Sequence, residues 1–248
     1  MGLIASHPAP IFEVGTPGAL PAALAAFGLT AGRPVLVSVG GASGLAAPVA
    51  EELGALFRER LAPLLDRLRA VVLDGGTDAG IMALMGRARR DAGAGFPLLG
   101  IAPRGTVVLP GEHRRGGVAL EPNHSHLLLV PGSDWGDEIP WMCRLATLIS
   151  GTRTSAMLVS GGGRVTARDV EAGLAAGRPA LLLCATGGVA DRLAHEVQAG
   201  LASGSLPDPL LRVVPAADRW SALPDMLARL LAAPDPRPLE GRGAVQAG

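Results

Sequence analysis

The chain has 248 residues, of which 48% are hydrophobic and 18% charged, and its 22 basic side chains balance 22 acidic ones. A chain of this length buries roughly 70–75% of its unfolded surface, so neither a metal nor a disulfide is needed for folding. Balanced charge and the scarcity of aromatic residues (four Phe, three Trp, no Tyr) argue against nucleic-acid binding. No apolar run reaches the ~20 residues of a membrane span, and the first residues do not resemble a secretory signal. We therefore expect a cytoplasmic protein with no membrane and no nucleic-acid partner.

Every basic residue is an arginine, because the sequence contains no lysine. This composition excludes the phosphate-binding lysine of Walker loops and any Schiff-base or lysine-base chemistry. The two cysteines, Cys143 and Cys184, lie far apart in apolar segments. That placement is typical of buried thiols in a reducing compartment.

Short apolar strands alternate with helices along the chain. The predicted strands are, in order, residues 34–39, 71–73, 97–102, 126–130, 156–160, 180–183 and 211–214. The predicted helices are residues 48–68, 81–90, 137–150 and 167–176, one ending near 199, and 219–232. Pro63 should kink or split the first helix. Residues 103–122, rich in Pro and Gly, form an excursion or loop.

This alternation predicts an α/β fold with a mainly parallel sheet covered by helices on both faces. We expect one domain over residues 1–232, followed by a disordered tail over 233–248, which is rich in Pro, Gly and charge. In such folds ligands bind at the carboxyl ends of the strands, near a reversal of strand order.

Four glycine-rich segments, 40–44, 74–80, 160–166 and 186–188, follow predicted strands. Glycine allows backbone N–H groups to approach a ligand, and the helix that follows favours an anion at its N-terminus. The alternative is that these glycines only permit tight turns. None of the segments matches the dinucleotide fingerprint G-x-G-x-x-G, so hydride transfer is not expected.

His124 and His126 would point to one face of an extended chain, as a metal-binding pair could. No third ligand stands at a suitable spacing, so we expect neither a metal nor another cofactor. His124 also opens an apolar strand, as a buried histidine would.

Several motifs occur together in one order. They are VSVGGA (37–42), LDGGTDAGIMALMGRA (73–88), LGIAPRGTV (99–107), NHSHLLLV (123–130), WGDEIP (135–140) and GGVADRLA (187–194). Over residues 10–200 the chain resembles the prokaryotic relatives of the cytosolic N-terminal domain of melastatin-type transient receptor potential channels. That domain belongs to the SLOG superfamily, with the Lonely Guy phosphoribohydrolases and the DNA-processing protein DprA.

The resemblance implies a Rossmann-like three-layer sandwich whose glycine-rich βα loops bind a nucleotide-derived ligand, of the ADP-ribose class in channel members. Trp135 would stack on a base, and Glu138 and His124 would shape the pocket. The ligand-binding residues expected in this way are Gly40, Gly41, Ala42, Ser43, Gly75, Gly76, Thr77, His124, Trp135, Glu138, Gly161, Gly162, Gly163, Arg164, Thr166, Gly187 and Gly188.

The chain departs at two positions from the channel proteins that it resembles. Met142 and Gly188 stand where ADP-ribose-binding members carry arginines, and two lost charge-assisted contacts cost ~1.5–3 kcal/mol each. Arg144 and Arg164 are close enough in sequence to replace them. A nucleotide-class ligand is therefore expected, without commitment to ADP-ribose itself.

Three functions remain open at this point. The first is a ligand-binding or sensor module, which we favour over an enzyme. The second is a Lonely Guy-like phosphoribohydrolase that cleaves an N-glycosidic bond. Its PGG-x-GT-x-x-E motif would correspond to SGGGRVTARD, with Asp169 in place of the glutamate and Arg164 or Arg168 as the arginine. The third is a structural or assembly domain that has lost its ligand, and a homo-oligomer is left open.

Overall fold

The computed structural model of the protein describes residues 2–4, 7–41, 44–112, 116–204 and 206–232. The expected tail, 233–248, lies outside the described residues.

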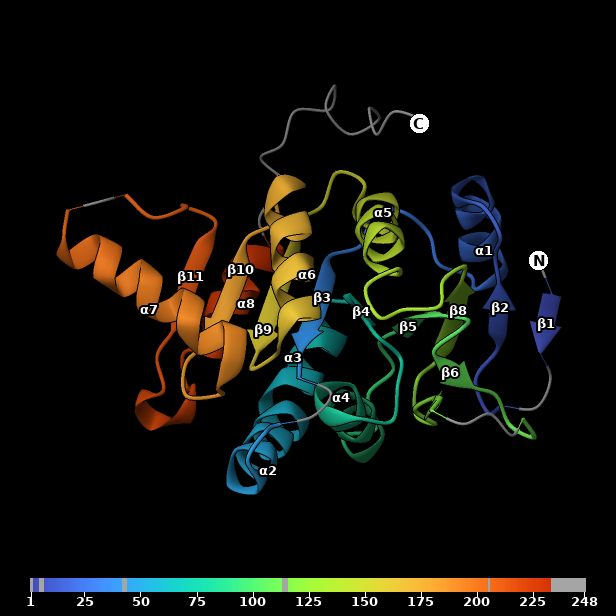
Figure 1. Cartoon of the computed structure of the whole chain (residues 1–248), viewed down its shortest axis with the longest axis horizontal. Coiled ribbons are helices and arrows are strands. Elements are labelled where there is room, and N and C mark those ends of the chain that lie inside the picture. Colours follow the sequence, from blue (N-terminus) through green and yellow to red (C-terminus); the bar gives the residue numbers. More distant parts are fainter. Residues whose placement is uncertain (1, 5–6, 42–43, 113–115, 205, 233–248) are drawn as a thin grey trace.

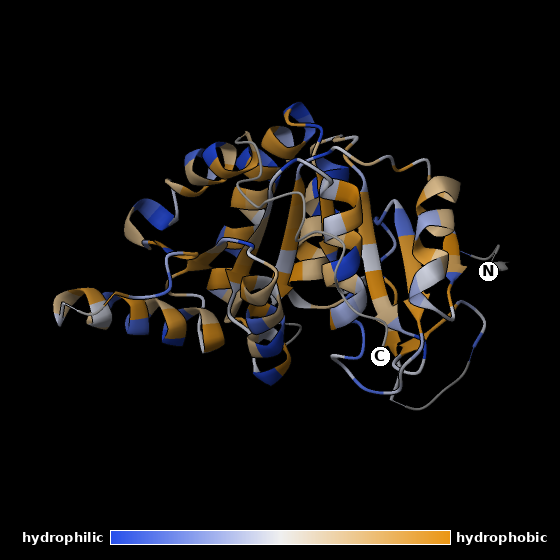
Figure 2. Ribbon diagram, turned by 90° about the horizontal axis from the view of Figure 1, so that it is seen from above, coloured by the Kyte–Doolittle hydropathy of each residue, from blue (hydrophilic) through white to orange (hydrophobic). Residues whose placement is uncertain are grey.

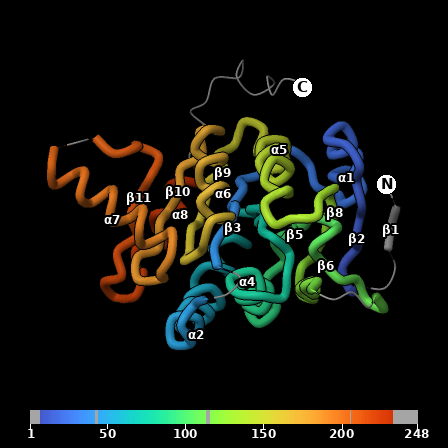
Figure 3. The backbone as a smooth tube through the Cα atoms, viewed as in Figure 1, coloured from blue at the N-terminus to red at the C-terminus, as the bar shows by residue number. Residues whose placement is uncertain are grey.

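Within these residues one large sheet dominates the structure (Figure 1). Its nine strands are, in spatial order, β1 (Gly2–Ile4), β2 (Ile11–Glu13), β8 (His126–Val130), β5 (Leu98–Pro103), β4 (Val71–Asp74), β3 (Val35–Gly40), β9 (Ser155–Ser160), β10 (Ala180–Leu183) and β11 (Leu211–Val214). All neighbouring pairs are parallel except β1 and β2. Strands far apart in sequence therefore lie side by side, as the chain path in Figure 3 shows for β3 and β9. The predicted Rossmann-like α/β fold is confirmed.

Helices cover both faces of the sheet (Figures 1 and 2). One face carries α1 (Leu20–Ala26), α5 (Ile139–Ser150), α6 (Arg164–Ala175) and α7 (Gly188–Ala202). The other carries α2 (Ala47–Leu56), α3 (Ala62–Arg67), α4 (Gly80–Asp91) and α8 (Leu223–Ala232). Figure 2 shows the apolar strands enclosed between helices whose polar residues turn outward.

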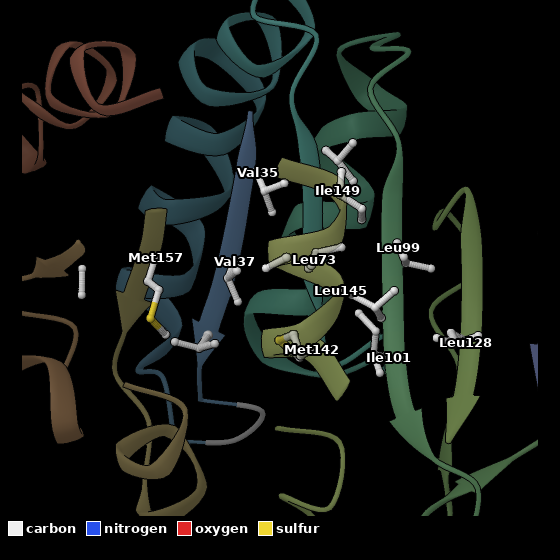
Figure 4. Close-up of a cluster of buried hydrophobic side chains, with 14 of the residues drawn as sticks. Val35, Val37, Leu73, Leu99, Ile101, Leu128, Met142, Leu145, Ile149 and Met157 are labelled. Carbon is white, nitrogen blue, oxygen red and sulfur yellow. The ribbon is translucent and has the colours of Figure 1, made fainter. Parts of the chain in front are cut away.

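The core is split by the sheet because successive strand residues point to opposite faces. In β3, Val35 and Val37 belong to the core on the side of α5, while Leu36 belongs to the core on the other side, with residues of α2 and α8. Figure 4 shows Met142 and Leu145 of α5 lying over the central strands. Continuous apolar strands thus bury both faces, as the sequence pattern predicts.

Helix boundaries differ from the predicted ones for local reasons. The stretch predicted as one helix over 48–68 is α2, then a π-helical turn (Phe57–Leu61), then α3, with Pro63 in the first turn of α3. Helix α6 begins at Arg164, three residues before the predicted start, with Gly163 as its N-cap. Helix α8 begins at Leu223 rather than 219, because residues 218–220 have positive φ, the first two of them inside a short 3-10 turn (Ala217–Arg219).

Two regions for which no strand or helix was predicted also form elements. The first 30 residues contribute β1, β2, a 3-10 turn (Pro17–Ala19) and α1. The excursion over 103–122 contains the short parallel pair β6 (Val107–Val108) and β7 (Val118–Ala119). The carbonyl of Ala119 accepts a hydrogen bond from the N–H of Asp78 (2.9 Å), so the excursion is tied to the loop after β4.

The strand order changes direction at the centre of the sheet. β3 is followed by α2 on one face, and its neighbour β9 is followed by α6 on the other. Loops that diverge in this way open a crevice at the carboxyl ends of the strands.

Candidate ligand-binding site

A cavity of about 590 Å³ occupies this crevice. It is lined by Ser38, Val39, Gly40, Gly41, Gly44, Leu45, Gly75, Thr77, Ala79, Met82, Val118, Trp135, Glu138, Met142, Gly161, Gly162, Gly163, Arg164, Val165, Thr166, Asp169, Thr186 and Gly188. Segments following β3, β4, β9 and β10 all contribute, so the four glycine-rich segments converge on one space. The volume lies within the 300–1,000 Å³ range of small-molecule sites.

The structure brings together most of the residues expected from the sequence. Those that line the cavity are Gly40, Gly41, Gly75, Thr77, Trp135, Glu138, Gly161, Gly162, Gly163, Arg164, Thr166 and Gly188, with Asp169 beside them. Gly76, His124 and Gly187 are not part of the lining. Ala42 and Ser43 lie outside the described residues.

Some of the glycines are required by packing between the loops. A Cβ on Gly188 would lie 2.1 Å from the carbonyl oxygen of Gly162, and one on Gly40 would lie 2.1 Å from that of Ser160. Gly163 differs, because its Cβ would meet no atom within 4 Å. Close packing therefore accounts for Gly40 and Gly188 without a ligand but leaves Gly163 unexplained.

The N-terminus of α6 opens into the cavity through Gly163, Arg164, Val165 and Thr166. The first N–H groups of a helix have no partner inside the helix, and within the described residues no side chain caps α6. Ser38 lies in the same lining, is only 2% exposed, and its Oγ makes no hydrogen bond to the described part of the chain. Backbone donors and Arg164 together make the part of the cavity at the start of α6 suited to an anion.

Another part of the lining is acidic. The Oε2 of Glu138, just before α5, accepts a hydrogen bond from the N–H of Gly136 (2.7 Å), and burial raises the pKa of the Glu138 carboxyl. Burial and then the nearby charge of Glu138 raise the pKa of Asp169 to about 8, although Arg168 opposes them. Arg168 lies over Gly136, where a Cβ would come within 2.5 Å of its Nη1. At neutral pH this wall therefore holds a protonated carboxyl that can donate a hydrogen bond.

His124 lies in a buried cluster of charges outside the cavity lining. Its Nε2–H donates to Oδ1 of Asp74 (2.7 Å) and its Nδ1–H donates to Oε2 of Glu121 (2.8 Å), and all three side chains are buried. Burial alone would lower the pKa of His124, but the two carboxylates outweigh it and raise the pKa to about 9. Asp74 also accepts the N–H of Gly76 (2.8 Å), so the cluster holds the loop that leads to Thr77 in the cavity.

The two histidines considered as a metal pair face different surroundings. His126 bonds to Ser125 Oγ and packs edge-on against Phe27, whereas His124 faces the two carboxylates. The described residues contain no group of three side chains placed to hold a metal ion. Cys143 and Cys184 are half-buried free thiols.

Sequence reasoning missed part of the lining: Ser38, Leu45, Met82, Val118 and Thr186. Ser38 carried a usable signal, because it is the one polar residue in the apolar run 35–39. Val118 carried none, because the excursion had no predicted structure. Thr186 Oγ1 accepts the N–H of Gly161 (2.8 Å) and donates to the carbonyl of Leu183 (2.7 Å), so it joins two of the loops.

The departures from the channel relatives have a structural explanation at Gly188. Its φ of +56° and its contact with Gly162 leave no space for an arginine. Met142 is buried and lines the cavity with its apolar side chain. Of the two arginines considered as replacements, Arg164 lines the cavity and Arg144 does not.

Among the described residues, no helix has both the length and the apolar character needed to cross a membrane.

Comparisons with known proteins agree with this architecture. The structure of the molybdenum cofactor carrier protein from Chlamydomonas reinhardtii is similar, with a TM-score of 0.52, 20% sequence identity, and coverage of 81% of this chain and 99% of that one. The X-ray structure of TM1055 gives a TM-score of 0.48 and 22% identity, covering 73% of this chain and 90% of that one. No curated protein matches the chain in sequence. The family described as "SLOG in TRPM, prokaryote" matches residues 33–220, and the chain belongs to this family.

Proposed function

We propose that the cavity binds a nucleotide-derived small molecule, of the nucleotide-sugar or ADP-ribose class, and that the protein acts as a ligand-binding or sensor module. The observation that carries this proposal is the convergence of four glycine-rich segments and the uncapped N-terminus of α6 on one cavity. A phosphate is the ligand group that best fits backbone donors at a helix N-terminus. Membership of the SLOG family supports the same ligand class.

The ligand phosphate lies, in this proposal, at Gly163 and Arg164. Trp135 is 39% exposed at the cavity, which leaves its ring free to stack on a base. Met82 and Val118 supply apolar surface on other segments of the lining.

Thermal shifts against a panel of nucleotides, nucleotide sugars and ADP-ribose test this proposal, after native mass spectrometry of the purified protein. A ligand present at 100 times its dissociation constant adds about 2.7 kcal/mol of stability, and so raises the melting midpoint by about 5–10 °C. No shift with any member of the panel would contradict the proposed ligand class.

Gly163→Asp is the informative variant, because the space beside Gly163 is open. The new carboxylate would cap α6 itself and repel an incoming phosphate, so we expect unchanged or slightly higher stability and loss of the thermal shift. Gly163→Asn is the matched control, since it caps the helix without adding charge and should lose less affinity. Equal ligand shifts in both variants and the wild type would place the phosphate elsewhere.

Hydrolysis of an N-glycosidic bond is the second candidate, because Asp169 faces the cavity as a carboxyl with a raised pKa of about 8. Such a group can act as a general acid near neutral pH. If the protein is a hydrolase, it should release free base from a nucleoside monophosphate. Asp169→Asn should then keep binding and lose turnover by at least 100-fold. Binding without base release in the wild type would reject this candidate.

A further inference from the structure

Part of the ligand cavity is built from two segments that are far apart in sequence. The loop after β4 lines the cavity at Thr77, and the end of the excursion lines it at Val118. A backbone hydrogen bond joins the two segments, because the N–H of Asp78 donates to the carbonyl of Ala119 (2.9 Å). The position of each segment in the cavity therefore depends on the other.

The same pairing continues to a buried imidazole. The N–H of Glu121 donates to the carbonyl of Gly76 (3.0 Å), and the N–H of Gly76 donates to Oδ1 of Asp74 (2.8 Å). The Nε2–H of His124 donates to Oδ1 of Asp74 (2.7 Å), and its Nδ1–H donates to Oε2 of Glu121 (2.8 Å). His124 therefore bonds the loop after β4 through one ring nitrogen and the end of the excursion through the other.

Close packing confines this imidazole from the side of β5. A Cβ on Gly100 would lie 2.4 Å from the Cα of Gly76 and 3.1 Å from Cδ2 of His124. Gly76 has a φ of +66°, and a Cβ there would lie 2.8 Å from the Cα of Gly100. The loop and the ring thus have little freedom to move toward β5.

We propose that His124 is a positioning residue of the ligand cavity, and that its imidazolium holds the loop after β4 and the end of the excursion together as one wall. His124 does not line the cavity itself, so it acts on the site through Thr77 and Val118. Loss of one proton leaves a ring nitrogen with a lone pair facing a carboxylate, which breaks one of the two bonds. The wall should then loosen. This inference rests on the proposed function only in that the wall faces the proposed ligand.

The groups around the ring make His124 the one that changes charge in the alkaline range. Burial alone would lower the pKa of His124, but Asp74 and Glu121 outweigh it and raise the pKa to about 9. Burial lowers the pKa of His7, in the N-terminal segment, so His7 is neutral above pH 7. Arg89 of α4, which interacts with the charge of Glu121, stays a cation. The sequence contains no lysine and no tyrosine, so few other side chains titrate near pH 9.

Amide hydrogen exchange of the ligand-free wild type, followed by NMR from pH 7 to 10, tests the proposal. The reporter is the N–H of Asp78, because its bond to Ala119 joins the two segments without touching the charged cluster. Its protection, relative to an unstructured peptide at the same pH, should fall by about 10-fold as the His124 ring nitrogens titrate at about pH 9. The N–H of Val71, bonded to the carbonyl of Pro34 at the other end of β4 (2.9 Å), should keep its protection.

Three variants separate the cation from its surroundings. His124→Gln removes the charge and should speed exchange at Asp78 by about 10-fold already at pH 7. Ser125→Ala is the matched control, because it removes two bonds to the backbone of Leu98 (2.8 and 3.0 Å) and leaves both carboxylates bonded. It should leave Asp78 protected. Glu121→Gln removes one charge that raises the pKa of His124, so protection at Asp78 should be lost about one pH unit lower.

Constant protection of Asp78 while the His124 nitrogens lose a proton would overturn the proposal. Equal losses of protection in His124→Gln and Ser125→Ala would also overturn it, because they would indicate a general loosening of the start of β8. The wild-type titration needs no variant, so it decides the question should His124→Gln fail to fold. Asp169 titrates at about 8, so its lower midpoint separates it from His124. No ligand is added, so a silent nucleotide panel would reject the proposed function alone.

Discussion

His124 makes a hydrogen bond to a carboxylate through each ring nitrogen, so both nitrogens carry protons and the ring is a cation. The cluster formed with Asp74 and Glu121 is buried, and Asp74 Oδ2 has no partner among the described residues. Buried charges of this kind add little to the stability of the folded state when they are paired. Loss of one partner lowers that stability by several kcal/mol. The position of the loop at Gly76 therefore depends on the protonated form of His124, because Asp74 bonds both of them.

His124→Gln should destabilise the protein by about 3–5 kcal/mol at pH 6, because it leaves two buried carboxylates without a cation. The pKa of His124 rises from 6.5 to about 9 on folding, so its stabilising effect is complete below pH 6.5 and is lost as the pH rises through about 9. Urea unfolding of both proteins at pH 6, 7.5 and 9.5 checks this prediction. The stability difference should shrink with rising pH, and a constant difference would contradict it.

At the level of elements, two glycines inside helices differ in how closely neighbouring side chains approach them. Gly86 in α4 faces the buried Glu121, and a Cβ there would lie 2.1 Å from Glu121 Oε2. Gly54 in α2 is also inside a helix, but its Cβ would make an ordinary 3.5 Å contact with Leu84. The same residue type thus serves a packing need in one helix and none in the other.

Gly54→Ala and Gly86→Ala should have opposite effects on stability. Alanine at 54 should stabilise by about 0.5–1 kcal/mol, because glycine inside a helix costs conformational entropy. Alanine at 86 should destabilise by about 2–3 kcal/mol, because it displaces Glu121 from its partners. Thermal unfolding of the two variants is sufficient, and a stabilised Gly86→Ala protein would show that α4 can move away from Glu121.

At the scale of the whole molecule, the candidate site exists because the parallel sheet brings segments from four parts of the chain together at the carboxyl ends of its strands. Loops 40–41, 75–77, 161–166 and 186–188 are separated by up to 148 residues in sequence, yet all four line one cavity, and three of them are in close contact at Gly40, Ser160, Gly162 and Gly188. One ligand in the cavity would touch several of them at once.

Hydrogen exchange should show this coupling directly. Binding of the nucleotide that gives the largest thermal shift should slow exchange in residues 40–41, 75–77 and 161–166 together, because it removes openings that these loops share. Residues 211–214 of the edge strand β11, away from the cavity, serve as the internal control. Protection confined to one loop would contradict a ligand held between them.

Much of this organisation is accessible from the sequence. Apolar strands followed by glycine-rich segments predict the parallel sheet and the order of strands and helices along the chain, since burial on both faces demands continuous apolar strands. They also predict the end of the sheet at which the cavity lies. Family motifs identified most of the cavity lining, including Trp135, Glu138 and Arg164. These are local patterns, set by neighbouring residues in the chain.

Tertiary structure alone decided the remaining features. His124 and Asp74 are 50 residues apart, and Asp169 meets Glu138 through the packing of α6 against α5, so no local pattern could show either pairing. The excursion became a cavity wall at Val118 because it bonds to the loop after β4. Composition and periodicity determine which surfaces are buried, whereas which charged groups meet depends on where the folded elements cross.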